Sequence, residues 1–276
     1  MKGWPTRLVL LGHPLGHSLS PRLQNAALKQ AAIPVSYEAL DVPRHALEET
    51  LAELRRARAA GNVTIPYKED VLAACDRITD SARAVGAVNT FWTAVDGAMV
   101  GDNTDAAGFD AAARRLLGDP PRGALVAVLG AGGGAAAVLH ALERWGVGAV
   151  RLYSRSADRA RRLVARFPSL PSTVTASAEE AVQGATIIVH ATPVGLHDDA
   201  TPFTVDALHA LSASSAVLDL AYRRGETALV RAARARGLRA QDGLPMLVEQ
   251  GALAFERWFS IVPDREAMWR ALGESR

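Results

Sequence analysis

The sequence predicts an α/β protein of two domains, one of them a doubly wound parallel sheet. Three observations lead to this fold class. The chain has 276 residues, and domains of about 100–200 residues make two the expected number. Short apolar runs alternate with helical patterns almost throughout, which is typical of parallel sheets covered on both faces. The composition changes at residues 119–123, Asp-Pro-Pro-Arg-Gly, where we expect a boundary.

The first apolar run, residues 8–11, predicts a strand that ends at Gly12. A helix pattern follows Pro21, which suits a first helical turn, and Ser20 is the expected N-cap. The other elements expected before the boundary are strands at 35–40 and 61–65, helices at 45–59, 68–75, 81–85 and 104–117, and a hairpin of 87–92 with 98–101. Those expected after it are strands at 124–129, 149–153, 185–190 and 216–220, and a last helix at 244–260.

The composition excludes several classes of protein. Lys and Arg number 31 against 29 Asp and Glu, a balance unlike that of a strongly cationic nucleic-acid binder. Hydrophobic residues make up 49% and charged residues 22%, as in a packed protein. No apolar run approaches the ~20 residues of a membrane-spanning helix, and the N-terminus lacks signal-peptide features. Cys75 is the only cysteine, and the seven histidines lack metal-ligand spacing. We expect a cytoplasmic enzyme that binds neither metal, membrane nor nucleic acid.

A glycine-rich turn at residues 130–135 lies between a predicted strand and a predicted helix. Gly130, Gly132 and Ala135 match the G-x-G-x-x-G/A spacing of Rossmann dinucleotide-binding domains. The first glycine permits the tight turn, the second lets the backbone approach a pyrophosphate, and the alanine keeps the helix close to the sheet. The strand before and the helix after favour this interpretation over a glycine-rich linker. The free N–H groups of the helix N-terminus would attract the anion.

The choice of cofactor depends on the end of the next strand, at Tyr153. An NAD site usually carries Asp or Glu about 20 residues after the glycine turn. This chain has Ser154-Arg155-Ser156 there, and Asp158 is expected inside the following helix. Guanidinium groups suit a 2′-phosphate, so we expect NADP rather than NAD. The alternative is that arginine stands here only because the chain is rich in it, since all but three of the 31 basic residues are arginines.

Four polar segments in the first half carry chemistry, at residues 18–21, 62–68, 86–90 and 101–105. Taken singly, their serines, asparagines and aspartates suit helix caps and turns. Taken together, they offer hydroxyl, amide, ammonium and carboxylate groups to one pocket. That inventory suits a small polyhydroxylated acid better than an apolar ligand.

These four segments and four later ones, taken in order along the chain, resemble the motifs of the shikimate dehydrogenase family. The resemblance covers nearly the whole sequence. The motifs that carry it are GHPLGHSLSP (12–21), NVTIPYK (62–68), GAVNT (86–90), GDNTD (101–105), GAGG (130–133), ATPVGL (191–196), DLAY (219–222) and GLPMLVEQ (243–250).

The resemblance implies the reversible reduction of 3-dehydroshikimate to shikimate with NADPH, a step of aromatic amino-acid biosynthesis, by a monomer or homodimer. It also implies that the C-terminal helices return to the first domain. Residues 1–105 with 244–276 then form an N-terminal α/β substrate-binding domain, and residues 106–243 form the Rossmann-type NADP-binding domain.

The resemblance also assigns site residues. Lys68 and Asp105 match the catalytic pair, and a lysine fits because, unlike arginine, it can give up its proton. The residues implied to bind substrate are Ser18, Ser20, Thr64, Asn89, Tyr222 and Gln250. Those implied to bind the cofactor are Gly130, Ala131, Gly132, Gly133, Gly134, Ala135, Ser154, Arg155, Ser156, Arg159, Thr192 and Gly243.

Two residues depart from the family pattern, because His190 and Ser154 both stand where asparagine is usual. Both lie in the cofactor half. Two enzyme alternatives are a quinate/shikimate and an aminoshikimate dehydrogenase that uses NAD. A third is a catalytically silent NADP-binding homologue, which the intact Lys68, Asp105 and Gln250 disfavour.

Overall fold

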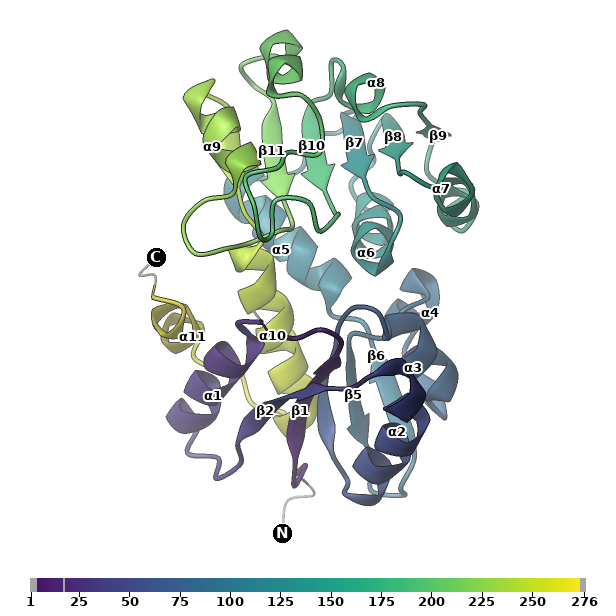
Figure 1. Ribbon diagram of the computed structural model, residues 1–276, viewed down its shortest axis with the longest axis vertical. Helices are drawn as coiled ribbons and strands as arrows, with labels where there is room; N and C mark the ends of the chain where they lie inside the picture. The colour runs from purple at the N-terminus through teal and green to yellow at the C-terminus, as the bar shows by residue number, and fades with distance from the viewer. Residues whose placement is uncertain (1–3, 17, 274–276) are drawn as a thin grey trace. The chain divides into compact units, whose positions relative to one another are not determined.

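The computed structural model describes residues 4–16 and 18–273 and divides the chain into two compact units, each containing one sheet (Figure 1). Unit 1 comprises Met1–Gly108 with Leu247–Arg276, and unit 2 comprises Phe109–Met246. Both junctions lie three residues beyond those expected from the sequence. His17, in the first motif, lies outside the described residues.

Unit 1 contains a mixed six-stranded sheet with the order β2-β1-β3-β5-β6-β4. β1 pairs in parallel with β2 and β3, whereas β5 runs antiparallel to both β3 and β6. The hairpin expected from residues 87–92 and 98–101 is therefore confirmed. The strands are β1 (Leu8–Gly12), β2 (Tyr37–Asp41), β3 (Ala60–Val63), β4 (Arg77–Ile78), β5 (Thr90–Thr93) and β6 (Met99–Asp102).

Helices cover both faces of this sheet. Alternate side chains of its strands point to opposite faces, so each set packs against a different group of helices. Val9 and Leu11 of β1 belong to one buried cluster with side chains of α2 and α3. On the other face Trp258 of α10 stacks on Tyr37 and donates a hydrogen bond to Thr90 Oγ1. The helices of this unit are α1 (Ser20–Gln30), η1 (Arg44–Ala46), α2 (Leu47–Arg56), α3 (Lys68–Ala74), α4 (Asp80–Val85), α11 (Arg265–Ala271) and most of α10 (Leu244–Phe259).

Unit 2 contains a six-stranded sheet with the order β12-β11-β10-β7-β8-β9, in which every pairing is parallel. The order reverses between β7 and β10, and ligands of doubly wound sheets bind beyond the carboxyl ends of the strands at such a point. The strands are β7 (Leu125–Leu129), β8 (Ala149–Tyr153), β9 (Ser172–Val174), β10 (Ile187–His190), β11 (Ala216–Asp219) and β12 (Arg239–Gln241). The helices are most of α5 (Asp105–Leu117), then α6 (Gly133–Leu142), α7 (Ala157–Val164), α8 (Ala178–Val182), η2 (Val205–Ala210) and α9 (Ala228–Ala235).

Two local expectations were wrong. Ser20 is not the N-cap of α1; the cap position is Leu19, which already has helical backbone angles, and Ser20 is the first helical residue. Its N–H instead points to Ser18 Oγ at 3.3 Å. The helix expected at residues 45–59 is η1 followed by α2, which ends at Arg56, because Arg58 has a left-handed φ of +50°.

Candidate active site

Lys68 and Asp105 form an ion pair in unit 1. Lys68 is the first residue of α3 and Asp105 the first residue of α5. Lys68 Nζ lies 2.6 Å from Asp105 Oδ2, and the two side chains are 20% and 7% exposed. Limited exposure strengthens the attraction relative to a surface pair, while the Lys68 side chain stays partly exposed.

Asn89 holds the other oxygen of this carboxylate. Its Nδ2 donates to Asp105 Oδ1 at 2.7 Å, and its Oδ1 accepts the Thr104 N–H, also at 2.7 Å. Asn89 is 2% exposed, so water hardly competes for the hydrogen bonds of its side-chain amide. Asp105 is therefore fixed through both oxygens, one to Lys68 and one to Asn89.

Gln250, from α10, completes the group. Its Oε1 lies 3.2 Å from Asn89 Nδ2, and its Nε2 donates to Leu247 O at 2.8 Å. Thr104 Oγ1 donates to the Gln250 carbonyl at 3.0 Å. The helices approach closely because Gly108 has no side chain; a Cβ there would lie 2.7 Å from Gln250 Cβ. Thr104 and Gly108 were not singled out from the sequence.

Two further asparagines support the pair. Asn103 Oδ1 accepts the N–H groups of Asp105 and Ala106 at 3.1 and 3.4 Å, so it caps α5, and its Nδ2 donates to Ala87 O. Asn62 Nδ2 donates to the Asn89 carbonyl at 3.2 Å. Both lie within motifs read from the sequence, but their role depends on contacts between segments far apart in the chain.

Asp41, at the end of β2, holds the loop that precedes α1. Its Oδ1 lies 2.6 Å from His13 Nδ1, and its Oδ2 accepts the Leu15 N–H at 3.0 Å. The Ser18 N–H donates to the Leu15 carbonyl at 3.1 Å. The hydrogen bonds from His13 and Leu15 lower the pKa of Asp41 below its ordinary value. Asp41 was not expected to contribute to the site.

Among the described residues, three further expected substrate ligands of unit 1 are not hydrogen-bonded to the Lys68–Asp105 pair. Between described residues, no hydrogen bond connects Ser18, Ser20 or Thr64 to Lys68 or Asp105. Thr64 follows β3 and packs close to Gly12, where a Cβ would lie 2.5 Å from Thr64 Cγ2.

The glycine-rich turn occupies the switch point of unit 2. Gly130 has φ +124°, and a Cβ there would lie 2.6 Å from Ala191 O, so only glycine fits without strain. Gly132 is the N-cap of α6 and offers no side-chain cap. No described atom lies within 4 Å of a Cβ built at Gly132, so the space above it is open. Ala135 is fully buried, which keeps α6 close to the sheet.

Arg155 and Arg159 follow β8 and are both exposed. Among the described residues, neither guanidinium forms an ion pair, whereas Asp158 pairs with Arg161 at 2.8 Å. Ser154 Oγ accepts the Ser156 N–H at 3.3 Å. The Ser156 hydroxyl caps α7 by accepting the Arg159 N–H. These arrangements leave two cations open to an anionic ligand and fit a phosphate group.

Three other expected ligands belong to unit 2. Thr192 lies just after β10 and its hydroxyl bonds to His190. A Cβ at the buried Gly243 would lie 2.2 Å from Leu220 O, so close backbone packing requires glycine there. Tyr222 follows β11 and is half-buried.

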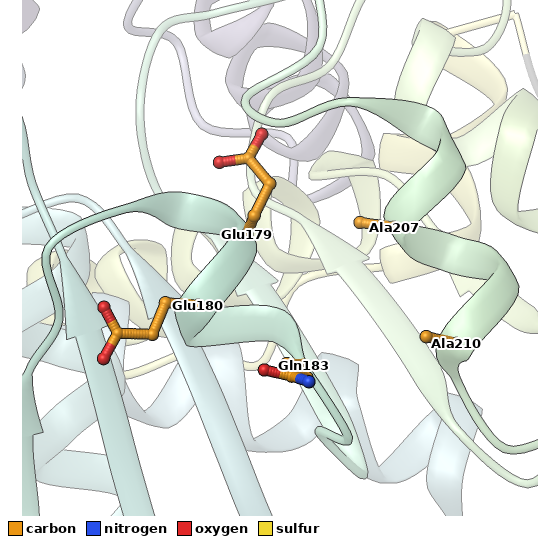
Figure 2. Close-up of a pocket in the computed structure, with 5 residues that line it drawn as sticks. All are labelled: Glu179, Glu180, Gln183, Ala207 and Ala210. Atoms are coloured by element: carbon orange, nitrogen blue, oxygen red, sulfur yellow. The ribbon is translucent and has the colours of Figure 1, made fainter.

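A separate hollow in unit 2 lies between α8 and η2 and contains none of the expected ligands. Figure 2 shows its lining residues Glu179, Glu180, Gln183, Ala207 and Ala210. Its carboxylates already accept backbone N–H groups, Glu179 from Thr204 and Glu180 from Ala176. Within the described residues, no group of three or more His, Cys, Asp or Glu could hold a metal ion, and no helix is long and apolar enough to cross a membrane.

A parallel sheet with a glycine turn at its switch point, accompanied by a lysine–carboxylate pair, defines a dinucleotide-dependent oxidoreductase. Three family models match the chain. They are the shikimate dehydrogenase substrate binding domain at residues 10–91, the shikimate 5'-dehydrogenase C-terminal domain at 243–272, and the coenzyme F420-dependent NADP oxidoreductase domain at 125–221.

Known relatives identify the family. A protein of Rubrobacter xylanophilus named shikimate dehydrogenase (NADP(+)) is 43% identical, over 95% of this chain and 94% of its own. The Thermus thermophilus enzyme, solved in complex with NADP(H) and shikimate, is 41% identical with a TM-score of 0.85, covering 96% and 97% of the two chains. The Aquifex aeolicus enzyme is 33% identical with a TM-score of 0.89, covering 98% of each chain. The chain belongs to the shikimate dehydrogenase family.

Proposed function

We propose that the chain catalyses the reversible NADPH-dependent reduction of 3-dehydroshikimate to shikimate. The observation that carries this proposal is the 2.6 Å contact between Lys68 Nζ and Asp105 Oδ2, formed by two motifs that resemble those of the family. A homologue that had lost catalysis would have no need to keep this pair. The named activity of relatives that match nearly the whole chain supports the same conclusion.

Lys68 is the proposed proton donor. As the substrate carbonyl is reduced, its oxygen gains negative charge and requires one proton. One N–H of the Lys68 ammonium points to Asp105, which leaves two N–H groups for that oxygen. After donation Nζ is neutral, and a proton would return from solvent along the partly exposed side chain. In the oxidation direction Lys68 accepts the proton from the substrate hydroxyl.

The remaining polar groups would hold the substrate. Asn89 and Gln250 lie beside the pair and suit hydroxyl groups, because amides both donate and accept hydrogen bonds. The hydroxyls of Ser18 and Ser20 suit a carboxylate. We assign Thr64 and Tyr222 to the same substrate on the resemblance alone.

NADP(H) fits the residues of unit 2. The open space above Gly132 and the uncapped first turn of α6 suit a pyrophosphate. Arg155 and Arg159 would hold the 2′-phosphate, with Ser154 and Ser156 beside them. The remaining backbone contacts would come from residues 130–135. Bound NADPH supplies the hydride, and the chain supplies the orientation and the proton.

A four-way assay tests the proposal. Shikimate and quinate are each offered with NADP⁺ and with NAD⁺, and reduction of the cofactor is followed at 340 nm. The proposal predicts that shikimate with NADP⁺ gives the highest kcat/KM of the four. Turnover that requires quinate or NAD⁺ would assign the chain to one of the alternative dehydrogenases, and no turnover with shikimate would refute the proposal.

A further inference from the structure

His190 belongs to a buried network in unit 2 that the proposed reaction does not use. We define the His190 network as Asp219, His190, Thr192 and Thr227. His190 Nδ1 lies 2.8 Å from Asp219 Oδ1, and the two residues are 0% and 1% exposed. His190 Nε2 bonds to Thr192 Oγ1, and Thr227 Oγ1 donates to Asp219 Oδ2 at 2.7 Å.

Both ring nitrogens of His190 take part in this network. Asp219 accepts from Thr227 and from the Ala221 N–H at 3.0 Å, and a carboxylate that only accepts requires His190 Nδ1 to donate in their contact. Thr192 Oγ1 also accepts the Val194 N–H at 3.3 Å, and its hydroxyl can either donate to His190 Nε2 or accept from it. In both arrangements His190 holds the Thr192 hydroxyl.

Thr192 connects this network to the glycine-rich turn. Its Cγ2 would lie 3.2 Å from a Cβ built at Gly130, so the methyl group covers the first glycine of the turn. A threonine has two heavy atoms on Cβ, so a bond that fixes the hydroxyl also fixes the position of the methyl group. His190 therefore determines which face of Thr192 meets Gly130.

We propose that His190 and Asp219 are positioning residues for cofactor binding, acting through the orientation of Thr192 against Gly130. This inference rests on the proposed use of NADP. It also changes the role of Thr192, whose hydroxyl is committed to His190, so that its contribution to the site is the placement of its methyl group. His190, one of the two departures from the family pattern, supplies an imidazole that bonds to a carboxylate through one ring nitrogen and to a hydroxyl through the other.

Substitution of His190 would leave Asp219 buried without its partner and could prevent folding, so Thr192 is the better position to change. Thr192→Val keeps the shape and removes the hydroxyl. Thr192→Ser keeps the hydroxyl and removes the methyl group. Thr201→Val is the matched control, because it removes one hydroxyl that donates to a backbone carbonyl, Phe203 O, in the same unit.

The dissociation constant of NADP⁺, measured by calorimetry without substrate, is the first readout. Loss of the hydroxyl frees the side chain to rotate, so Thr192→Val is expected to weaken NADP⁺ binding by about tenfold, the scale of one hydrogen bond. Thr192→Ser is expected to weaken NADP⁺ binding by about fourfold, the scale of one buried methyl group, because it removes the methyl group that meets Gly130. Thr201→Val is expected to stay within about twofold, a small fraction of one hydrogen bond. Shikimate binding should be unchanged in all three. Equal NADP⁺ affinity in Thr192→Val and the wild type would overturn the proposal.

The ring nitrogens of His190 give a second readout that a purely structural role would not require. Nitrogen-15 spectra of the whole chain are expected to show a His190 Nε2 signal that shifts in Thr192→Val and stays unchanged in Thr201→Val. An Nε2 signal unaffected by Thr192→Val would contradict the inference. Both measurements remain valid if the wild type binds NADP⁺ but does not oxidise shikimate. Failure of the proposed function can therefore be distinguished from failure of the proposed positioning role of His190 and Asp219.

Discussion

Lys68 Nζ lies 2.6 Å from Asp105 Oδ2, although 37 residues separate them in the chain. The contact joins the first residues of two helices, α3 and α5. Asn89 holds the second carboxylate oxygen, so Asp105 cannot turn away from Lys68 without breaking that bond as well. This fixed geometry suits proton transfer, for which the donor must be held within hydrogen-bond reach of the substrate.

Removing the negative charge of Asp105 should impair turnover. Asp105→Asn keeps the size of the side chain but no longer attracts the Lys68 ammonium, so kcat for shikimate oxidation should fall by about 10²-fold or more. Binding of shikimate should change much less. Asp70→Asn is the control, because Asp70 also pairs with a cation, Arg44, on the surface of the same unit. Equal losses in the two variants would show that the charge at Asp105 has no special role.

Asp41 should influence substrate affinity, because it holds the loop that leads to Ser18. Asp41→Asn is expected to raise KM for shikimate several-fold and to leave KM for NADP⁺ unchanged. Glu38→Gln is the control, since Glu38 lies on the same strand and pairs with Arg7. A similar rise in both variants would point to a general effect of the strand.

The same carboxylate predicts a pH dependence. The pKa of Asp41 is lowered in the folded protein, so the bond stabilises the fold above the unfolded pKa and is lost as pH falls through the folded pKa. Wild type and Asp41→Asn should therefore differ in melting temperature at neutral pH and converge in acid, below the ordinary value near 3.8. A difference that persists in acid would contradict this assignment.

Arg155 should contribute to the preference for NADP over NAD. Arg155→Ala removes a guanidinium without an ion pair among the described residues, so it should weaken NADP⁺ binding by at least tenfold, as expected for loss of a charge-assisted bond. NAD⁺ affinity should stay nearly constant. Arg161→Ala, which removes a cation already paired with Asp158, is the control. An equal loss for the two cofactors in Arg155→Ala would exclude a phosphate contact.

Cys75 should be unreactive in the folded chain. Burial raises the pKa of its thiol to about 12, so the thiolate is scarce at neutral pH. Alkylation by iodoacetamide at pH 8, followed by mass spectrometry, should be much slower in the native protein than in urea. Rapid labelling of the native protein would show that Cys75 is accessible.

The sequence predicted the elements that carry strong local signals. The apolar runs of β1, β7, β8, β10 and β11 identify strands, and the glycine spacing places the turn before α6. The short strands β4, β9 and β12 have only two or three residues and no apolar run, so pairing with a neighbour rather than local pattern defines them.

The candidate site was predictable to a similar degree. The motifs contain Lys68, Asp105 and Asn89, and the structure brings these side chains together. Thr104 and Gly108 act through contacts with Gln250, which lies 146 residues from Thr104 in the chain, and no local pattern encodes such contacts. Ser20 shows the opposite error, because a good local capping signal was overridden by helical angles at Leu19.

We propose that Lys68 transfers the proton in an NADP-dependent oxidation of shikimate. The most direct measurement compares NADPH formation from saturating shikimate and NADP⁺ by the wild type and by Lys68→Ala, with shikimate binding to each measured by calorimetry. We expect rapid turnover by the wild type, a fall of kcat by about 10²-fold or more in Lys68→Ala, and shikimate affinity that changes far less. Near-normal turnover by Lys68→Ala would contradict it.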